Sequence, residues 1–397
     1  MSSGPNPRWH NWSGRLRAQP KQLHFLRSEA DASALLRDAA QQGRCVRATG
    51  AGHSHAPLVT NDAGVIVDCS GLSGVIEVNR EQRTGRVWAG TPIYALGRPL
   101  HDVGLALHNQ GDIDRQSLAG AIATGTHGSG ARLGNLSSAV LGVTLIDASG
   151  TQRQCSATQE PDLFQAIRLN LGALGLVTQV QLQLRDSYRL EEHSWQAPLA
   201  EILAQLPELI DAHRHFEFFW YPNSDQAHAK YMDETPAEAE YPLAVEGQRR
   251  AQNYEVLPNH RPHAHTEMEY SVPADAGPEC MAAIAQLLRS EHPDVAWPVE
   301  YRTLAADDVW LSTAYKQNCV TISVHQDVNK DERAYYRDCE EIFLHYGGRP
   351  HWGKVHYLTG TQLRQCHPRW DDWWAIRNKT DPDGVFLNEY LRGWQQA

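Results

Sequence analysis

Residues 47–55, with the sequence RATGAGHSH, place glycines and other small residues beside two histidines. The segment begins at the end of residues 44–48, whose composition predicts a strand. Glycines leave backbone N–H groups free to surround a phosphate. A Rossmann-type dinucleotide site is disfavoured, because its G-x-G-x-x-G pattern has to open a helix and Pro57 stands where that helix would begin. Taken alone, the segment also fits a glycine turn with two incidental histidines.

A second loop, residues 109–130, has the sequence NQGDIDRQSLAGAIATGTHGSG. From Ser117 to Gly130 it contains four glycines, three alanines and two threonines. These residues are too small to build a core and too apolar for a flexible linker. Such a stretch suits a backbone that lies flat against a large planar ligand. The two loops together predict a site for a planar ligand that carries phosphate.

The elements that must position these loops follow two patterns. Between residues 45 and 180, short β-branched runs separated by glycine predict strands with tight turns, and helices are predicted at 93–103 and 161–170. From about residue 187 the chain is richer in aromatic and acidic residues. The second region has predicted helices at 199–213 and 278–291 and predicted strands at 215–222, 265–273 and 320–327. This alternation predicts a sheet covered by helices on one face.

Composition sets the class of protein. A length of 397 residues predicts two or three domains, and 41% hydrophobic with 21% charged residues is typical of a globular protein. The net charge of −11 argues against a nucleic-acid partner and favours a small-molecule ligand. Seven dispersed cysteines without a C-x-x-C pair predict reduced thiols. No run of about 18 apolar residues predicts a membrane span, and residues 1–17 lack a signal-peptide pattern, so a cytoplasmic location is expected.

Two other kinds of site are disfavoured. His260, His263 and His265 could be imagined as zinc ligands, but they lie in a proline-rich loop with no cysteine and no H-E-x-x-H motif. No metal site is therefore expected. A serine hydrolase is disfavoured because its G-x-S-x-G turn is absent.

In combination, the motifs resemble those of FAD-linked oxidases of the vanillyl-alcohol oxidase type, in particular the aldonolactone oxidases and alditol oxidases. The resemblance implies an α+β fold: a PCMH-type FAD-binding domain of two subdomains at residues 1–185, a substrate-binding cap with an antiparallel sheet at 186–355, and a C-terminal segment, 356–397, that returns to the FAD domain. It spans nearly the whole chain and rests on Trp12-Ser-Gly, the G-x-G-H-S loop, the loop from Ser117 to Gly130, Gly172-Ala-Leu-Gly175, Glu267-Met-Glu-Tyr270, Glu300-Tyr-Arg302 and His351-Trp-Gly-Lys354.

The resemblance also implies how FAD is held. His53 takes the position of the histidine that bonds covalently to the 8-methyl carbon of the flavin ring, with His55 as the alternative. No cysteine occurs between His108 and Gly130, so a single link is expected. His127 could instead be a packing histidine. The residues implied to contact the cofactor are Thr49, Gly50, Ala51, Gly52 and Ser54 at the pyrophosphate, Gln110, Gly111, Asp112, Ser117, Gly120, Ala123, Thr124, Gly125, His127 and Gly130 along the remainder, and Val177 near the adenine.

Oxidation of a hydroxyl-bearing carbon requires hydride loss to flavin N5 and removal of the hydroxyl proton by a base, a task that suits histidine. The resemblance places the base at His325, with Lys354 beside it, and has Glu300 and Arg302 bind substrate hydroxyl groups. The two-residue spacing of Glu300 and Arg302, repeated by His325 and Asp327, puts the members of each pair on one side of a strand. A surface or salt-bridge role is the alternative for His325, Lys354, Glu300 and Arg302.

The expected electron acceptor and substrate depend on a few positions in the second loop and on Asp327. Gly111 matches the position beside the ring carbon that oxygen attacks, and glycine leaves that path open, so oxygen is the expected acceptor and hydrogen peroxide the product; a turn glycine is the alternative. Asp112 and Asp327 stand where alditol oxidases have serine and threonine. With the run from Asn109 to Asp114, this favours an aldono-1,4-lactone as substrate.

Other functions stay open at this point. One is an alditol oxidase acting on xylitol- or sorbitol-like polyols, and another is a lactone dehydrogenase with a different acceptor. A non-catalytic flavin- or sugar-binding protein belongs to another class. The joint presence of His53, His325 and Lys354 argues against it.

Overall fold

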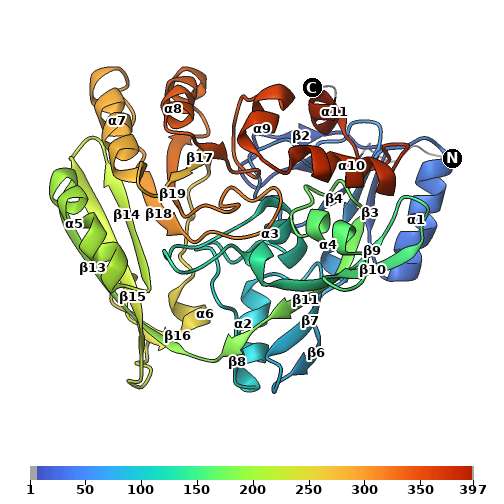
Figure 1. Ribbon diagram of the computed structural model, residues 1–397, viewed down its shortest axis with the longest axis horizontal. Helices are drawn as coiled ribbons and strands as arrows, with labels where there is room; N and C mark the ends of the chain where they lie inside the picture. The colour runs from blue at the N-terminus through green and yellow to red at the C-terminus, as the bar shows by residue number, and fades with distance from the viewer. Residues whose placement is uncertain (1–6, 396–397) are drawn as a thin grey trace.

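The computed structural model describes residues 7–395, which form two regions that lie side by side (Figure 1). The first region begins with a parallel sheet, ordered β3 (Gln22–Phe25), β5 (Val65–Asp68), β4 (Val46–Thr49). Helix α1 (Glu29–Gln41) buries Ala32, Leu36 and Ala39, which recur at helical spacing and share a core with β4 and β5. The glycine-rich segment after β4 therefore leaves a rigid strand.

An antiparallel sheet of five strands completes the first region. Its order is β10 (Gln152–Ser156), β9 (Val140–Ile146), β11 (Leu176–Gln183), β7 (Thr84–Trp88), β6 (Val75–Asn79). Besides α1, this region contains the helices α2 (Tyr94–Asp102), α3 (Leu118–Thr124) and α4 (Pro161–Ile167). Helix α3 lies within the second small-residue loop, and its apolar side chains Leu118, Ala121 and Ile122 are buried in the main core of the region.

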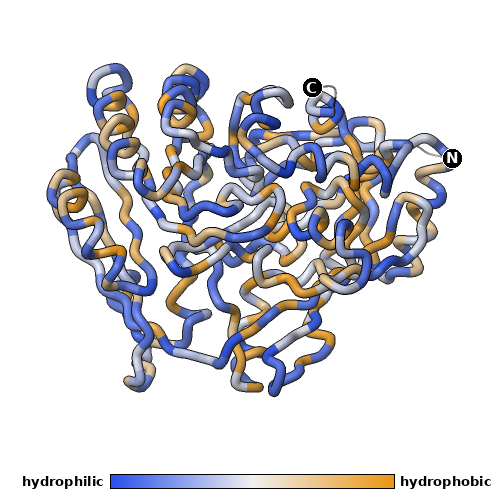
Figure 2. Tube along the Cα trace, viewed as in Figure 1, coloured by the Kyte–Doolittle hydropathy of each residue, from blue (hydrophilic) through white to orange (hydrophobic). Residues whose placement is uncertain are grey.

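The second region is built on an antiparallel sheet of eight strands. Its order is β16 (Arg250–Gln252), β13 (Arg189–Pro198), β15 (Gln226–Thr235), β14 (His215–Tyr221), β18 (Val299–Leu304), β19 (Cys319–Asp327), β17 (His265–Pro273), β20 (Arg349–Pro350). Helices α5 (Leu199–Ala212), α7 (Gly277–Ser290) and α8 (Arg333–His345) cover its outer face (Figure 1) and share one apolar core with it. Figure 2 shows hydrophilic residues along the outer parts of α7 and α8. The inner face is left to form the site.

The C-terminal helices α9 (Gly360–Cys366), α10 (Trp370–Thr380) and α11 (Glu389–Gln395) pack on the first region. Trp373 lies in its core and donates its indole N–H to the carbonyls of Ala166 and Leu169, at 3.1 and 3.0 Å. Buried Arg47 on β4 donates to the carbonyls of Leu58, Leu171, Gly172 and Phe386 and so ties three segments together. The chain end thus braces the strand that precedes the first loop.

The remaining elements are short: β1 (Trp9–His10) with β2 (Arg17–Ala18), β8 (Leu105–Ala106) with β12 (Arg185–Asp186), α6 (Asn253–Val256), and the 3-10 turns η1 (Cys69–Gly71) and η2 (Leu136–Ala139). Among the described helices, none combines the length and apolarity needed to span a bilayer. The predicted α+β architecture with an antiparallel second sheet is confirmed. The domain boundaries at 185 and 355 stay predictions, and residues 1–6 and 396–397 of the outer segments lie outside the described residues.

Candidate active site

Two cavities adjoin each other: the larger lies between the two regions, and the narrower lies within the first region. The larger, of about 650 Å³, faces the inner side of the eight-stranded sheet, and the narrower, of about 110 Å³, runs among small residues near β4 and α3. His53 and Gln116 belong to the walls of both. A long ligand with a slender end and a broad end would therefore pass from one cavity into the other at His53.

Close backbone approach shapes the narrower cavity. A Cβ atom at Gly50 would lie 2.0 Å from Ser117 Oγ, so only glycine allows the first loop to reach α3. Ser117 caps α3 by accepting from the Gly120 N–H at 3.3 Å. Small side chains beside backbone N–H groups suit a pyrophosphate. The predicted cofactor residues that line this cavity are Thr49, Gly50, Ala51, Gly52, His53, Ser54, Ser117, Gly120, Ala123, Thr124 and Val177.

Three predicted cofactor residues lie off both cavity walls. Gly125 ends α3 with a left-handed φ of 74°. Gly130 donates its N–H to the Thr303 carbonyl at 2.9 Å and so joins the loop to β18. Gln110 is buried, and its backbone N–H donates to Asn109 Oδ1 at 3.0 Å. These residues shape the loop, and their contact with a cofactor stays a prediction.

His53, Gly111 and His127 reach the larger cavity from the first region. Burial and the nearby Lys354 ammonium lower the pKa of His53 to about 4. His127 is buried between Glu269, 2.9 Å from its Nε2, and the Gly128 carbonyl, 2.9 Å from its Nδ1. His127 therefore both lines the cavity and packs through hydrogen bonds.

Three adjacent strands supply the opposite wall. Glu267 on β17 lies directly across from His325 on β19, and Glu300 and Arg302 follow at two-residue spacing on the neighbouring β18. The pleat sends these side chains to the same face. The structure thus brings Glu300, Arg302 and His325 together on one cavity wall, where Lys354 joins them.

Glu267 contacts both Lys354 and His325 on this wall. Its carboxylate accepts a short hydrogen bond from Lys354 Nζ and lies 3.8 Å from His325 Nε2. Burial alone would raise the pKa of Glu267, but Lys354, His265 and His325 bring it well below its usual value. Burial also disfavours the Lys354 ammonium, yet Glu267 raises the pKa of Lys354. The two residues therefore form a partly buried ion pair beside the predicted base.

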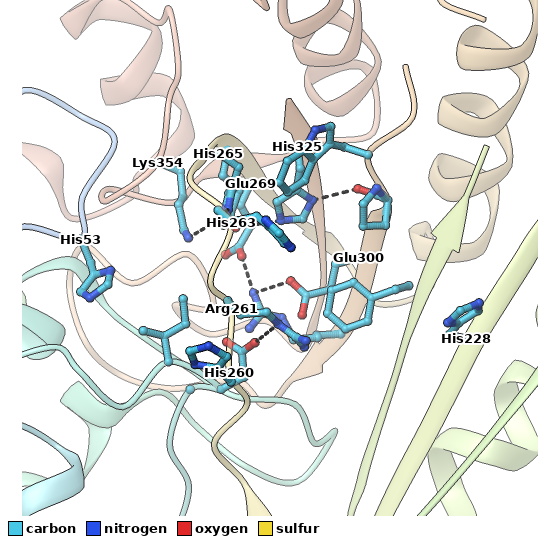
Figure 3. Close-up of a pocket in the computed structure, with 18 of the residues that line it drawn as sticks. His53, His228, His260, Arg261, His263, His265, Glu269, Glu300, His325 and Lys354 are labelled. Atoms are coloured by element: carbon cyan, nitrogen blue, oxygen red, sulfur yellow. Dashed lines mark hydrogen bonds and ion pairs between the residues drawn. The ribbon is translucent and has the colours of Figure 1, made fainter. Parts of the chain in front are cut away.

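His325 has a defined tautomer. Its Nδ1 donates to the Pro298 carbonyl at 2.8 Å, because a carbonyl can only accept (Figure 3). Burial lowers the pKa of His325 to about 4, so the ring is neutral. The lone pair consequently sits on Nε2, the nitrogen nearer Glu267.

Arg302 forms a second cluster of charged side chains with Glu269 and Glu300. The Arg302 guanidinium lies 2.6 Å from the Glu269 carboxylate and 3.2 Å from that of Glu300 (Figure 3). Ser323 and His127 also hydrogen-bond Glu269 and satisfy that carboxylate. Burial, opposed by Arg302, raises the pKa of Glu300 to about 8. Glu300 is therefore the carboxyl group of the wall most ready to carry a proton near neutral pH.

Asp112 is held by a loop of the second region. Arg261 Nε lies 3.2 Å from Asp112 Oδ2, and its guanidinium stacks over Phe219 at 5.0 Å. The Asn259 N–H donates to the Asp112 carbonyl at 2.8 Å. Figure 3 shows Arg261 and His260 on this loop in front of the Glu300 wall. Residues 258–264 thus bridge the two regions at the larger cavity.

Sequence reasoning left several wall residues without a role: Arg261, His265, Glu267, Glu269 and His351. The alternation of Glu267 and Glu269 along a predicted strand was a usable signal, since it sends both carboxylates to one face. Asp327, in contrast, lies off the cavity and accepts the Asn329 N–H at 2.8 Å. Its predicted role stays untested.

Sequence comparison finds full-length relatives. Residues 180–248 and 238–394 match the family model described as D-arabinono-1,4-lactone oxidase, and residues 20–156 match that of an FAD binding domain. The chain is 36% identical to the L-gulono-1,4-lactone dehydrogenase of Mycobacterium tuberculosis, over 98% of this chain and 99% of the relative. It is 27% identical to the L-gulonolactone oxidase of Mus musculus, over 96% and 97%. It is 30% identical to the alditol oxidase of a Streptomyces species, also over 96% and 97%.

Solved structures share the fold at low sequence identity. A solvent-stable cholesterol oxidase superposes with a TM-score of 0.88 at 17% identity, covering 98% of this chain and 97% of that one. The 6-hydroxy-D-nicotine oxidase of Arthrobacter nicotinovorans superposes with a TM-score of 0.75 at 17% identity, covering 98% of each chain. At such identities the likeness concerns architecture alone.

Proposed function

The chain belongs to the D-arabinono-1,4-lactone oxidase family, and from that membership we propose that it oxidises a hydroxyl group of an aldono-1,4-lactone with FAD. The predicted PCMH-type FAD-binding fold is confirmed by the FAD binding domain match and by the fold shared with cholesterol oxidase. The observation that carries the proposal is the junction of the two cavities at His53, with a base, a lysine and a carboxylate–arginine pair on the opposite wall.

FAD fits the paired cavities. Glycine and alanine around the narrower cavity would hold its pyrophosphate, and the larger cavity has room for both flavin ring and substrate. When bound, FAD would supply the two-electron chemistry of hydride acceptance. We assign the covalent link to His53, because His53 lines both cavities whereas His55 lines only the larger one.

The chain's own residues bind the substrate and move its proton. His325 Nε2 carries the lone pair that would take the hydroxyl proton. Glu267, 3.8 Å away, would stabilise the resulting imidazolium, and Lys354 holds Glu267 in place. Arg302 and Glu300 offer donors and an acceptor to the neighbouring hydroxyl groups.

A substrate panel tests the proposal. Under anaerobic conditions, L-gulono- or D-arabinono-1,4-lactone should bleach the flavin absorbance of the purified protein, while xylitol and sorbitol should not. Bleaching by the polyols alone would establish the alditol oxidase alternative, which the Streptomyces relative supports. If neither class bleaches the flavin, the protein is a binder and the proposal fails.

We propose oxygen as the acceptor, because Gly111 bears no side chain on the cavity wall. A Cβ at this position would lie 3.2 Å from the His127 carbonyl oxygen and 3.3 Å from Thr126 Cγ2. In Gly111→Ala, reoxidation of the reduced protein by oxygen should slow by about tenfold or more, equivalent to about 1.4 kcal/mol of barrier. Stopped-flow mixing of reduced protein with oxygen measures the rate.

Gly393→Ala is the matched control for this variant, because a Cβ there meets nothing within 4 Å. Its reoxidation should equal that of the wild type. A wild type that reacts slowly with oxygen but rapidly with a quinone would instead be a dehydrogenase, as the Mycobacterium tuberculosis relative is named.

A further inference from the structure

Three side chains on the wall of the larger cavity share an arrangement that proton removal at His325 does not explain. Potential ligand atoms of His55, His265 and Glu267 all lie within 4.8 Å of one another, and all three residues are buried. The Nε2 atoms of His265 and His55 lie 3.7 and 4.0 Å from the same Glu267 oxygen, Oε2. These separations are too long for hydrogen bonds, but ligands of a tetrahedral zinc ion lie about 3.3 Å apart.

The tautomer of His265 leaves its Nε2 lone pair free to bind a cation. Its Nδ1 donates to the His263 carbonyl at 2.9 Å, so in the neutral ring Nε2 carries the lone pair that faces the Glu267 carboxylate. Two acceptors that face each other repel unless a positive group lies beside them, and in this structure the Lys354 ammonium is that group. A metal-bound histidine characteristically donates its other N–H to a carbonyl in this way.

His55 supplies a second, independent observation. Its side chain is only 4% exposed. Its Nδ1 is buried and has no hydrogen-bond partner among the described residues. Its Nε2 lies beyond hydrogen-bond reach of Glu267. No partner among the described residues therefore fixes either ring nitrogen of His55, and Nε2, on the side of Glu267, is available to a ligand.

The donor set selects the class of ion. Two imidazole nitrogens with one carboxylate oxygen suit zinc and its neighbours, whereas magnesium and calcium prefer oxygen alone. We propose that His55, His265 and Glu267 bind one zinc-class divalent cation with an open fourth position toward the cavity. This departs from the sequence expectation of no metal site, and it uses His265 with partners other than His260 and His263, whose side chains are exposed.

The bound ion inhibits the enzyme, an effect that rests on the proposed function. Lys354 donates to the same Glu267 oxygen that the ion would bind. Because the ammonium and the ion are both positive, the ion displaces Lys354 from Glu267 and disturbs the wall beside His325. Removal of the competing charge in Lys354→Met should therefore tighten zinc binding, by tenfold or more.

The test uses the holoprotein, stripped of metal with EDTA and titrated with Zn²⁺ against a chromophoric zinc indicator. The wild type should bind one equivalent. His265→Ala and His55→Phe should each weaken binding by at least about tenfold. His263→Ala is the matched control, because His263 is an exposed histidine of the same loop that contributes only its backbone carbonyl. Its affinity should stay within about twofold of the wild type.

Zinc should slow anaerobic bleaching by lactone over the same concentration range in which it binds, and EDTA should restore the rate. Absence of stoichiometric binding, or equal weakening by His263→Ala and His265→Ala, overturns the site. Tighter binding in Lys354→Met supports it in a way that misfolding cannot imitate. If zinc binds as expected but no lactone bleaches the flavin, the proposed function fails and the site stands. If lactone bleaches normally and zinc does not bind, the site fails and the function stands.

Discussion

Replacing His325 by alanine should slow the anaerobic reduction of the flavin by lactone by a factor of about 10² to 10⁴. His325 donates its Nδ1–H to the Pro298 carbonyl, and its Nε2 lone pair lies 3.8 Å from the Glu267 carboxylate. Removal of the ring leaves the hydroxyl proton without an acceptor of suitable strength. Stopped-flow absorbance at saturating lactone measures the rate of this step directly.

Two variants separate a proton acceptor from a positioning group. His325→Gln keeps a donor for the Pro298 carbonyl but has no basic nitrogen, so it should be as slow as His325→Ala. His228→Ala removes another cavity histidine, which lies on β15 far from Lys354 (Figure 3), and its rate should stay within about threefold of the wild type. A loss of less than tenfold in both His325 variants would contradict the assignment.

The sequence predicted the elements of the site better than the contacts between them. The helix expected at 199–213 is α5, Leu199–Ala212, and the strand expected at 320–327 is β19, Cys319–Asp327. Both follow from periodicity, which is a local property of the chain. The pairing of Glu267 with His325 depends instead on the register of β17 against β19, which no local pattern encodes.

Arg261 marks the limit of sequence reasoning most clearly. It lies in an irregular, proline-containing loop without periodicity, and it contacts Asp112 across 149 residues of chain. Asp112 was singled out because a carboxylate replaces a serine there, but its partner could not be inferred. Once the fold brings the two regions together, the partly buried carboxylate favours a cation nearby, and Arg261 is that cation.

The limits differ for the cofactor loops. Glycine at position 50 follows from a steric requirement, since a Cβ would collide with Ser117. A requirement of this kind is visible in the sequence as a glycine. Gly125 and Gly130 are glycines for another reason, because both adopt positive φ values, 74° and 144°. Residue type alone does not separate a glycine that faces a ligand from one that turns the chain.

Acid precipitation of the wild type should leave flavin in the protein pellet, and His53→Ala should release all of it into the supernatant. The expectation rests on position: His53 lies where the narrow and broad cavities join, against Trp12, with ring centroids 5.4 Å apart. The loop around Gly50 is unchanged in the variant, so FAD should still bind without a bond, and the native variant should be yellow before precipitation.

His55→Ala is the matched control, because His55 stands two residues further along the same loop and lines only the larger cavity. It should retain flavin in the pellet. Retention in His53→Ala with release in His55→Ala would move the bond to His55, whose ring would then be unable to bind zinc. Release from the wild type would rule out a covalent link. It would not contradict non-covalent binding of FAD in the two cavities. The experiment therefore separates attachment from recognition, which depend on different residues of one loop.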